Sequence, residues 1–250
     1  MNQLKNHLKE FKLAGMLNSV EDRITYANDS SLSYGQFLAL LCEDEASNRQ
    51  DNSHKKRYAR AKLAAHKTIE EFDFSYQPSI DKKQINDAVT CQYINEKKNL
   101  IFIGSPGTGK THLAIALAIK ALAKNYKVLF SSVSEMLYQL HLSKADNSYY
   151  KKLQEYLLPD LLVLDELGFK KVPGYSADDF FEVISKRYER GSCIITTNKN
   201  FEQWGEIFAD QILSSAILDR LIHHATIVKI NGSSYRSRAL KNIIMEKKND

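Results

Sequence analysis

The chain has 250 residues, 43% hydrophobic and 26% charged, with only 10 Gly and 4 Pro. This is the composition of an ordinary globular protein, long enough for one large domain or for a small and a medium one. Cys42, Cys91 and Cys193 are odd in number and include no CxxC pair, which argues against a disulfide framework and a zinc site and fits a reducing compartment.

The net charge of +5 is concentrated in two segments. Residues 47–67 hold seven basic residues against one acidic residue, and residues 219–248 hold seven against two. Concentrated positive charge is suited to binding a polyanion. The alternative is that these charges form the solvated face of a helix and bind nothing. The first residues contain no uninterrupted apolar core, and the run "LAIALAI" at 113–119 is too short to cross a bilayer. We therefore expect a cytoplasmic protein with no membrane partner.

Residues 3–67 carry a helical pattern without strand signals. The stretch "SLSYGQFLALLCEDEA" places Ser33 and Gln36 in capping-box positions, and the basic strip "HKKRYARAKLAAHK" at 54–67 predicts a third, separate helix. Residues 68–80 turn acidic, then aromatic, and contain Pro78. We expect a small all-helical domain over 1–67, a linker over 68–80 and a second domain over 81–250.

Short apolar runs alternate with helical stretches in the second domain. Strands that are buried on both faces have this pattern, so the chain predicts an α/β fold with a doubly wound parallel sheet of five strands. The predicted strands are 99–104, 127–132, 160–167, 192–198 and 226–230.

The stretch "GSPGTGKT" at 104–111 follows the first strand and opens a helix, which is the context of a phosphate-binding loop. Its glycines let backbone N–H groups turn toward phosphate oxygens, and the helix N-terminus adds partial positive charge. Lys110 is expected to reach the β- and γ-phosphates, and the Thr111 hydroxyl to coordinate Mg²⁺. The predicted nucleotide-binding residues are Gly104, Ser105, Pro106, Gly107, Thr108, Gly109, Lys110, Thr111 and His112.

Two further strand ends carry candidate catalytic groups. Asp165 and Glu166 end the strand "LLVLDEL"; the first carboxylate suits the Mg²⁺ ligand set, and the second can orient and deprotonate an attacking water. Asn198 ends "IITTN" and is a candidate to hold that water. An acidic pair of this kind indicates hydrolysis of a nucleoside triphosphate.

These motifs, with "RYERGSCIITTN", "ILDRLIHHATIVKING" and "SYRSRA", resemble the AAA+ ATPases of the IstB and DnaC type over about residues 68–240. The resemblance implies the AAA+ P-loop fold. It also implies that Arg220 is an arginine finger acting on a neighbouring subunit and that Arg236 is a sensor-II residue, with Arg238 as its substitute. Arg187 and Arg190 remain alternatives for the finger. About twenty residues follow the last strand, so we expect a reduced lid.

The basic strip suggests sequence-tolerant binding of duplex DNA through the phosphate backbone, with a solvated face as the alternative. A lysine- and tyrosine-rich segment at 143–157 and the loop after the Asp-Glu pair are further candidates. The adjacent His223 and His224 are expected to be packing or surface residues. The predicted DNA-binding residues are Lys55, Lys56, Arg57, Tyr58, Arg60, Lys62, Lys144, Lys151, Lys152, Lys170 and Lys171.

The resemblance to IstB implies an ATP- and Mg²⁺-dependent transposition helper that oligomerises on target DNA and recruits a transposase. A DnaC-type loader of a replicative helicase is the first alternative, and the basic strip favours the transposition helper. A small-molecule kinase ranks lower because it has no need of the Asp-Glu pair or of Arg220. A purely structural binder ranks lower because every catalytic element sought is present.

Overall fold

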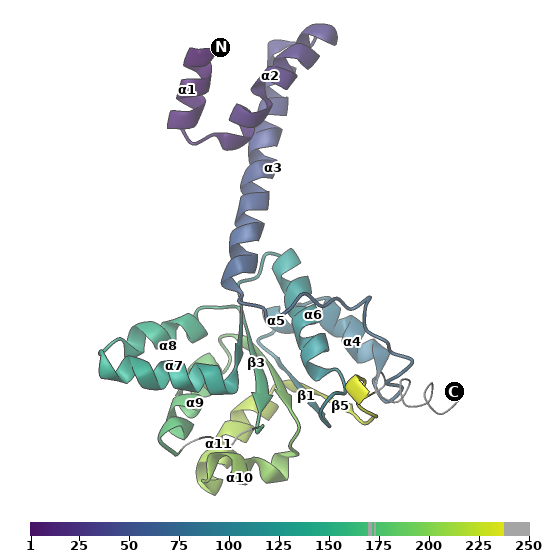
Figure 1. Ribbon diagram of the computed structural model, residues 1–250, viewed down its shortest axis with the longest axis vertical. Coiled ribbons are helices and arrows are strands. Elements are labelled where there is room, and N and C mark those ends of the chain that lie inside the picture. The colour runs from purple at the N-terminus through teal and green to yellow at the C-terminus, as the bar shows by residue number, and fades with distance from the viewer. Residues whose placement is uncertain (170–171, 173, 238–250) are drawn as a thin grey trace, which may run out of the picture. The chain divides into compact units, whose positions relative to one another are not determined.

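The computed structural model describes residues 1–169, 172 and 174–237. The chain separates into two compact units, Met1–Arg57 and the part that begins at Tyr58. The first unit consists of α1 (Asn2–Glu10), α2 (Ala14–Asp29) and the greater part of α3 (Tyr34–Arg60) (Figure 1). Leu8, Val20 and Leu41 form its small core. The all-helical character of the N-terminal region is confirmed.

Helix α2 packs closely on α3 because Gly15 has no side chain. A Cβ on Gly15 would lie 2.6 Å from the Asp44 carbonyl oxygen and from the Glu45 Cα. The buried Glu45 carboxylate accepts the Gly15 N–H at 2.7 Å, which satisfies a free donor at the start of α2. Arg23 adds a two-pronged bond to the Asp44 carboxylate at 2.7 and 2.8 Å.

The N-terminal helices differ from the prediction at one place. The capping box of Ser33 and Gln36 is confirmed, with the Ser33 N–H bound to the Gln36 side chain at 2.9 Å. The separate basic helix is wrong, because α3 continues unbroken to Arg60 and the strip supplies only its last turns. The helix ends before Lys62, whose φ is +52°, so Lys62 and Lys67 lie beyond it.

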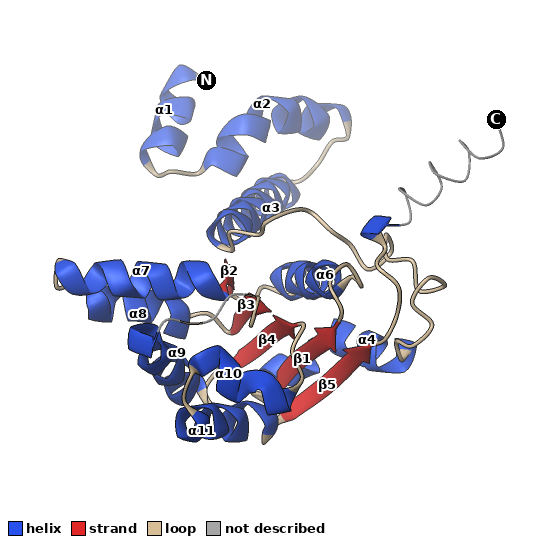
Figure 2. Cartoon of the chain, turned by 60° about the horizontal axis from the view of Figure 1, so that its bottom comes forward, coloured by secondary structure: helices blue, strands red, loops and turns tan. Residues whose placement is uncertain are grey.

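The second unit contains a five-stranded parallel sheet of order β2-β3-β4-β1-β5 (Figure 2). Every neighbouring pair is parallel, as predicted. The strands differ from the predicted ranges by one residue at most. They are β1 (Asn99–Gly104), β2 (Val128–Ser132), β3 (Leu161–Leu167), β4 (Ser192–Thr197) and β5 (Ala225–Ile230).

Helices cover both faces of the sheet, so the doubly wound architecture is confirmed. Alternate residues of β1 face opposite cores: Leu100 and Phe102 pack in one, Ile101 and Ile103 in the other. The first core includes α4 (Lys82–Val89), α5 (Gln92–Asn95) and α6 (Lys110–Ala123). The second includes α7 (Val133–Ala145), α8 (Tyr149–Leu157), α9 (Gly174–Arg187), α10 (Trp204–Phe208) and α11 (Gln211–Ile222), and a 3₁₀ turn, η1 (Phe201–Gln203), precedes α10.

The segment after α3 belongs to the second unit. Ala61 is fully buried, and its carbonyl accepts the Phe130 N–H of β2 at 2.8 Å, which pairs part of that strand's outer edge. No helix in the described ranges combines the length and the apolar character that a bilayer crossing requires.

Candidate nucleotide-binding site

The loop between β1 and α6 has the backbone conformation that its glycines allow. Gly107 and Gly109 adopt φ values of +80° and +97°, in the left-handed region that other residues avoid. The Phe72 ring lies directly against Gly109, and a Cβ there would be 2.5 Å from the ring's Cε2 atom. Glycine at 109 is therefore required both by the turn and by the aromatic ring beside it.

Lys110 is the first residue of α6, and its side chain folds back over the loop. Its ammonium group donates to the carbonyls of Gly104 and Ser105, both at 2.8 Å. Burial lowers the pKa of Lys110, and the nearby Asp165 carboxylate opposes that shift. These bonds hold a cation at the mouth of the loop, within reach of an incoming polyphosphate.

Asp165 lies at the carboxyl end of β3 and is 6% exposed. The Thr111 hydroxyl is 2.9 and 3.1 Å from its two carboxylate oxygens. The Thr196 hydroxyl of β4 donates to the same carboxylate and accepts the Glu166 N–H at 2.9 Å. Thr196 thus links the Asp-Glu pair to the adjacent strand, a role that its sequence position alone does not indicate.

Glu166 points away from its neighbour in the pair. The pairing of β3 with β4 shifts between Leu164 and Leu167, and Glu166 takes a left-handed φ of +63°. Its side chain is exposed whereas Asp165 is buried. Asn198 follows β4 directly and is also exposed. One carboxylate therefore faces the phosphate loop's threonine, and the other is open to water.

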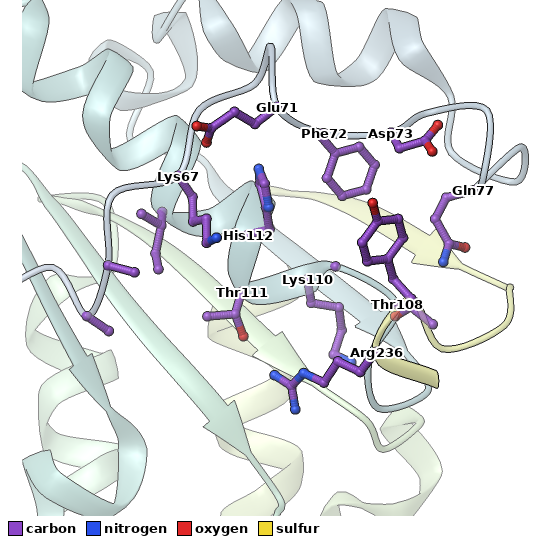
Figure 3. Close-up of a pocket in the computed structure, with 16 residues that line it drawn as sticks. Lys67, Glu71, Phe72, Asp73, Gln77, Thr108, Lys110, Thr111, His112 and Arg236 are labelled. Atoms are coloured by element: carbon purple, nitrogen blue, oxygen red, sulfur yellow. The ribbon is translucent and has the colours of Figure 1, made fainter. Parts of the chain in front are cut away.

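A cavity of about 500 Å³ lies beside the phosphate loop (Figure 3). Its opposite wall comes from residues 64–77, so the segment predicted as a linker lines the cavity. Phe72 and Gln77 are the main contributors that the sequence reasoning missed. Gln77 is 2% exposed and donates to the Ser233 carbonyl at 2.9 Å. The aromatic content of "EEFDFSYQP" was the available signal for this wall.

His112 holds this wall in place. Its Nε2 lies 2.8 Å from the Thr68 carbonyl oxygen, and its ring meets Phe72 edge-on at 5.3 Å. His112 thus contributes to the cavity through its contacts with the covering segment. Its assignment as a nucleotide contact stays a prediction.

Arg236 also lines the cavity, close to Lys110 (Figure 3). Its segment is attached to the phosphate loop because the Tyr235 N–H donates to the Gly107 carbonyl at 2.9 Å. The exposed Arg236 adds positive charge that lowers the pKa of Lys110. Arg238 lies outside the described residues.

The candidate finger residues differ in burial. Arg187 is 2% exposed, and its guanidinium donates to five main-chain carbonyls, at 2.7–3.4 Å, around the start of β3 and β4. This bonding gives Arg187 a structural role and excludes it as a finger. Arg190 is exposed. Arg220 is half-buried on α11, with its guanidinium 4.9 Å from the centre of the Phe181 ring.

The candidate DNA-binding residues differ in exposure and in their partners. Lys55, Lys56 and Arg60 are exposed on α3, Lys62 is exposed beyond it, and Lys151 is exposed on α8. The others have protein partners: Arg57 bonds Ser53, Tyr58 packs on the core, Lys144 pairs with the buried Asp179 at 2.8 Å, and Lys152 pairs with Glu155 at 3.0 Å. Lys170 and Lys171 lie outside the described residues.

Comparison with known proteins agrees with this geometry. The family model described as IstB-like ATP binding protein matches residues 6–242. The ATP-binding protein of insertion sequence IS5376 from Geobacillus stearothermophilus is a relative. It is 40% identical over 90% of this chain and 89% of its own length. The corresponding IS21 protein of Pseudomonas aeruginosa is 37% identical over 94% of this chain and 89% of its own.

The fold is also similar to that of a solved helicase loader. The crystal structure of the DnaC helicase loader superimposes with a TM-score of 0.51 and 25% identity, covering 70% of this chain and 99% of that one. The family model and the two insertion-sequence relatives extend over nearly the whole chain, including the helical N-terminal region. The chain therefore belongs to the family of IstB-like ATP binding proteins, and the AAA+ fold that the resemblance implied is confirmed.

Proposed function

We propose that this protein is an ATPase that assembles with further copies of itself on duplex DNA and recruits a transposase. The observation that carries the proposal is the hydrogen-bonded group of Thr111, Asp165, Thr196 and Glu166 beside a cavity of about 500 Å³. Binding of ATP alone needs the loop and Lys110. The buried Asp165 carboxylate beside the exposed Glu166 carboxylate, at the end of β3, supports hydrolysis as well.

The residues present fit a magnesium ion. The Thr111 hydroxyl and the Asp165 carboxylate converge to 2.9 Å, and both are the oxygen ligands that Mg²⁺ prefers. Bound there, the ion would neutralise charge on the β- and γ-phosphates. The chain's own cations, Lys110 and Arg236, would bind the same phosphates from the loop and from the segment after β5.

The exposure of Glu166 and Asn198 supports a role for both side chains in acting on water. The exposed Glu166 carboxylate would accept a proton from the attacking water, and the Asn198 amide at the adjacent strand end would orient that water. The Thr196 hydroxyl accepts the Glu166 N–H, which fixes the backbone of the base relative to Asp165. The exposed Glu166 side chain could then turn toward the phosphate.

Assembly is supported by the place of Arg220. The neighbouring residue Leu221 accepts a hydrogen bond from the Asn99 side chain at 3.0 Å, so Arg220 lies by the amino end of β1. The phosphate loop begins at the other end of that strand, about 16 Å away at a rise of ~3.3 Å per residue. Arg220 would therefore contact the γ-phosphate bound by a neighbouring copy of the chain. Hydrolysis would then depend on assembly of the copies.

Binding to DNA is supported by the exposed cations of the basic strip, Lys55, Lys56, Arg60 and Lys62. Such side chains release counterions from the phosphate backbone and read no base sequence. Recruitment of a transposase is supported by the insertion-sequence names of the relatives. Action on a replicative helicase is the alternative, which the similarity to the DnaC helicase loader favours.

The test is binding of short duplex and single-stranded DNA across a salt series, with ATP, with ADP and without nucleotide. Duplex binding is expected to require ATP and to weaken steeply with salt. Lys55→Ala/Lys56→Ala is expected to lower the slope of log K against log salt by about two, since two phosphate contacts are lost. The matched control is Lys9→Ala/Lys127→Ala, which removes two exposed lysines outside the strip.

Two results would overturn the proposal. If both double variants weaken binding equally, the strip has no particular role in DNA binding. If only single strands bind, and the strip variants do not matter, the helicase-loader function replaces transposition.

A further inference from the structure

Glu189, His223 and His224 form a cluster of potential metal ligands on the second unit. Glu189 lies in the turn between α9 and β4, and the two histidines lie between α11 and β5. One ligand atom from each residue lies within 4.8 Å of the other two. The His224 Nε2 is 3.6 Å from a Glu189 carboxylate oxygen, close to the separation of about 3.4 Å between two ligands of a tetrahedral Zn²⁺ ion.

The backbone on both sides of the cluster is fixed. The His224 carbonyl accepts the Asn99 N–H at 2.7 Å, which joins it to the start of β1. The turn that carries Glu189 closes on Arg187, whose carbonyl accepts the N–H groups of Arg190 and Gly191 and whose guanidinium is anchored by five carbonyls. The separation of the ligands is therefore set by the sheet, and small side-chain rotations suffice to bring them together.

Tyr188 supplies an outer partner for the histidines. Its hydroxyl lies 2.7 Å from the His223 Nδ1, and its ring lies 6.1 and 6.2 Å from the two imidazole rings. A metal-binding histidine usually bonds another group through its second ring nitrogen, which fixes the ring's orientation and tautomer. A pair of unrelated surface histidines has no need of this arrangement.

The surrounding charges set the strength of binding. Asp219 and Glu189 bring negative charge to Tyr188, and Arg220 opposes them. Lys97 and Arg220 also line the small cleft next to Glu189 and His224. A bound dication would therefore be repelled by the nearby cations as well as attracted by the carboxylates. An exposed site with a free coordination position also fits reversible binding better than a permanent structural role.

We propose that Glu189, His223 and His224 form a binding site for Zn²⁺, with Tyr188 as the positioning residue. Imidazole ligands select borderline metals over Mg²⁺, and Zn²⁺ accepts two imidazoles, a carboxylate and water without geometric strain. The absence of paired cysteines argued against a zinc site in the sequence, and the two histidines were expected to be packing or surface residues. The structure adds Glu189, from 34 residues upstream, which no local pattern connects with them.

The test is calorimetric titration of the metal-stripped full chain with Zn²⁺, in excess Mg²⁺ so that the phosphate site does not compete. All proteins carry Cys42→Ser, since this exposed thiol is a competing ligand. We expect one Zn²⁺ per chain, and binding at least tenfold weaker in Glu189→Gln and in His224→Gln. With Co²⁺ as the probe, these variants are expected to lose the visible absorption of a tetrahedral complex.

Two further variants separate a built site from chance contact. Tyr188→Phe retains every ligand and is expected to weaken Zn²⁺ binding by about tenfold, as loss of an outer partner does. His141→Gln removes an exposed histidine of α7 and is expected to change nothing. Zn²⁺ binding that survives His223→Gln/His224→Gln, or that His141→Gln weakens equally, overturns the proposal. Unfolding temperatures without metal verify that the variants are folded.

Discussion

Replacing Thr196 by valine tests how the Asp-Glu pair is held. The Thr196 hydroxyl donates to the Asp165 carboxylate and accepts the Glu166 N–H at 2.9 Å. Valine has nearly the same shape, so the buried strand keeps its packing while both hydrogen bonds disappear. The change removes the link between the Asp165 carboxylate and the Glu166 main chain and leaves both acidic side chains in the protein.

The size of the effect follows from the bond to the buried carboxylate. A hydrogen bond to a charged group contributes about 1.5–3 kcal/mol. If that energy holds the pair in its reactive arrangement, kcat for ATP hydrolysis falls about ten- to hundredfold, at ~1.4 kcal/mol for each factor of ten. ATP affinity is expected to change little, because the loop and Lys110 are untouched.

The assay is single-turnover ATP hydrolysis beside equilibrium binding of an ATP analogue, with Thr197→Val as the control. Thr197 is equally buried on the same strand, but its hydroxyl donates to the Leu167 carbonyl at 2.8 Å. Both variants are expected to lose stability, so only hydrolysis distinguishes them. Equal losses of kcat in the two variants, or a loss confined to ATP affinity in Thr196→Val, would refute the reasoning.

Three further predictions concern the loop and the two units. Gly109→Ala places a methyl group against Phe72 and is expected to weaken binding of a fluorescent ATP analogue. Adding Phe72→Leu to the same chain should restore part of that binding, and a double variant that binds no better would contradict the clash. Hydrogen bonds from Arg23 lower the pKa of Asp44 from 3.8 to about 2, so this stabilisation is present above pH 3.8 and is lost as the pH falls toward 2. Urea unfolding of Asp44→Asn should show a loss of stability of only about 1 kcal/mol at pH 7, because the Arg23–Asp44 pair is partly solvated. The loss should shrink at pH 3, and a loss that does not depend on pH would contradict this account of the pair. Arg187→Met leaves five carbonyls without their donor and is expected to cost about 3 kcal/mol or more in unfolding free energy, because each buried acceptor left unsatisfied costs about 1–3 kcal/mol. A loss below about 1 kcal/mol would show that water replaces the guanidinium.

The sheet was predictable because each strand is a short apolar run rich in Ile, Leu and Val, and runs of this length favour a strand buried on both faces over a helix. The prediction of a separate basic helix was wrong because the sequence before the strip contains no signal that ends a helix. Residues 43–60 contain neither glycine nor proline, so nothing local ends α3 there. The helix ends only where Ala61 becomes buried against the edge of β2.

The phosphate loop and the Asp-Glu pair were predictable because their chemistry is local in sequence. Thr196 lies within a predicted strand, but its contacts depend on β4 lying next to β3, which no spacing reveals. Phe72 and Gln77 fell in a presumed linker, and their function arises because that segment returns across the loop. Residues whose role depends on such placement require the three-dimensional structure.

The left-handed backbone at Glu166 has an evolutionary consequence. A side chain in that conformation costs about 1 kcal/mol relative to glycine, so folding and the catalytic role that we propose for Glu166 favour different residues at this position. A lineage released from selection for hydrolysis is expected to replace the glutamate by glycine or asparagine and to become more stable as it does so. The residue found at position 166 in any descendant of this chain would thus record whether hydrolysis is still under selection.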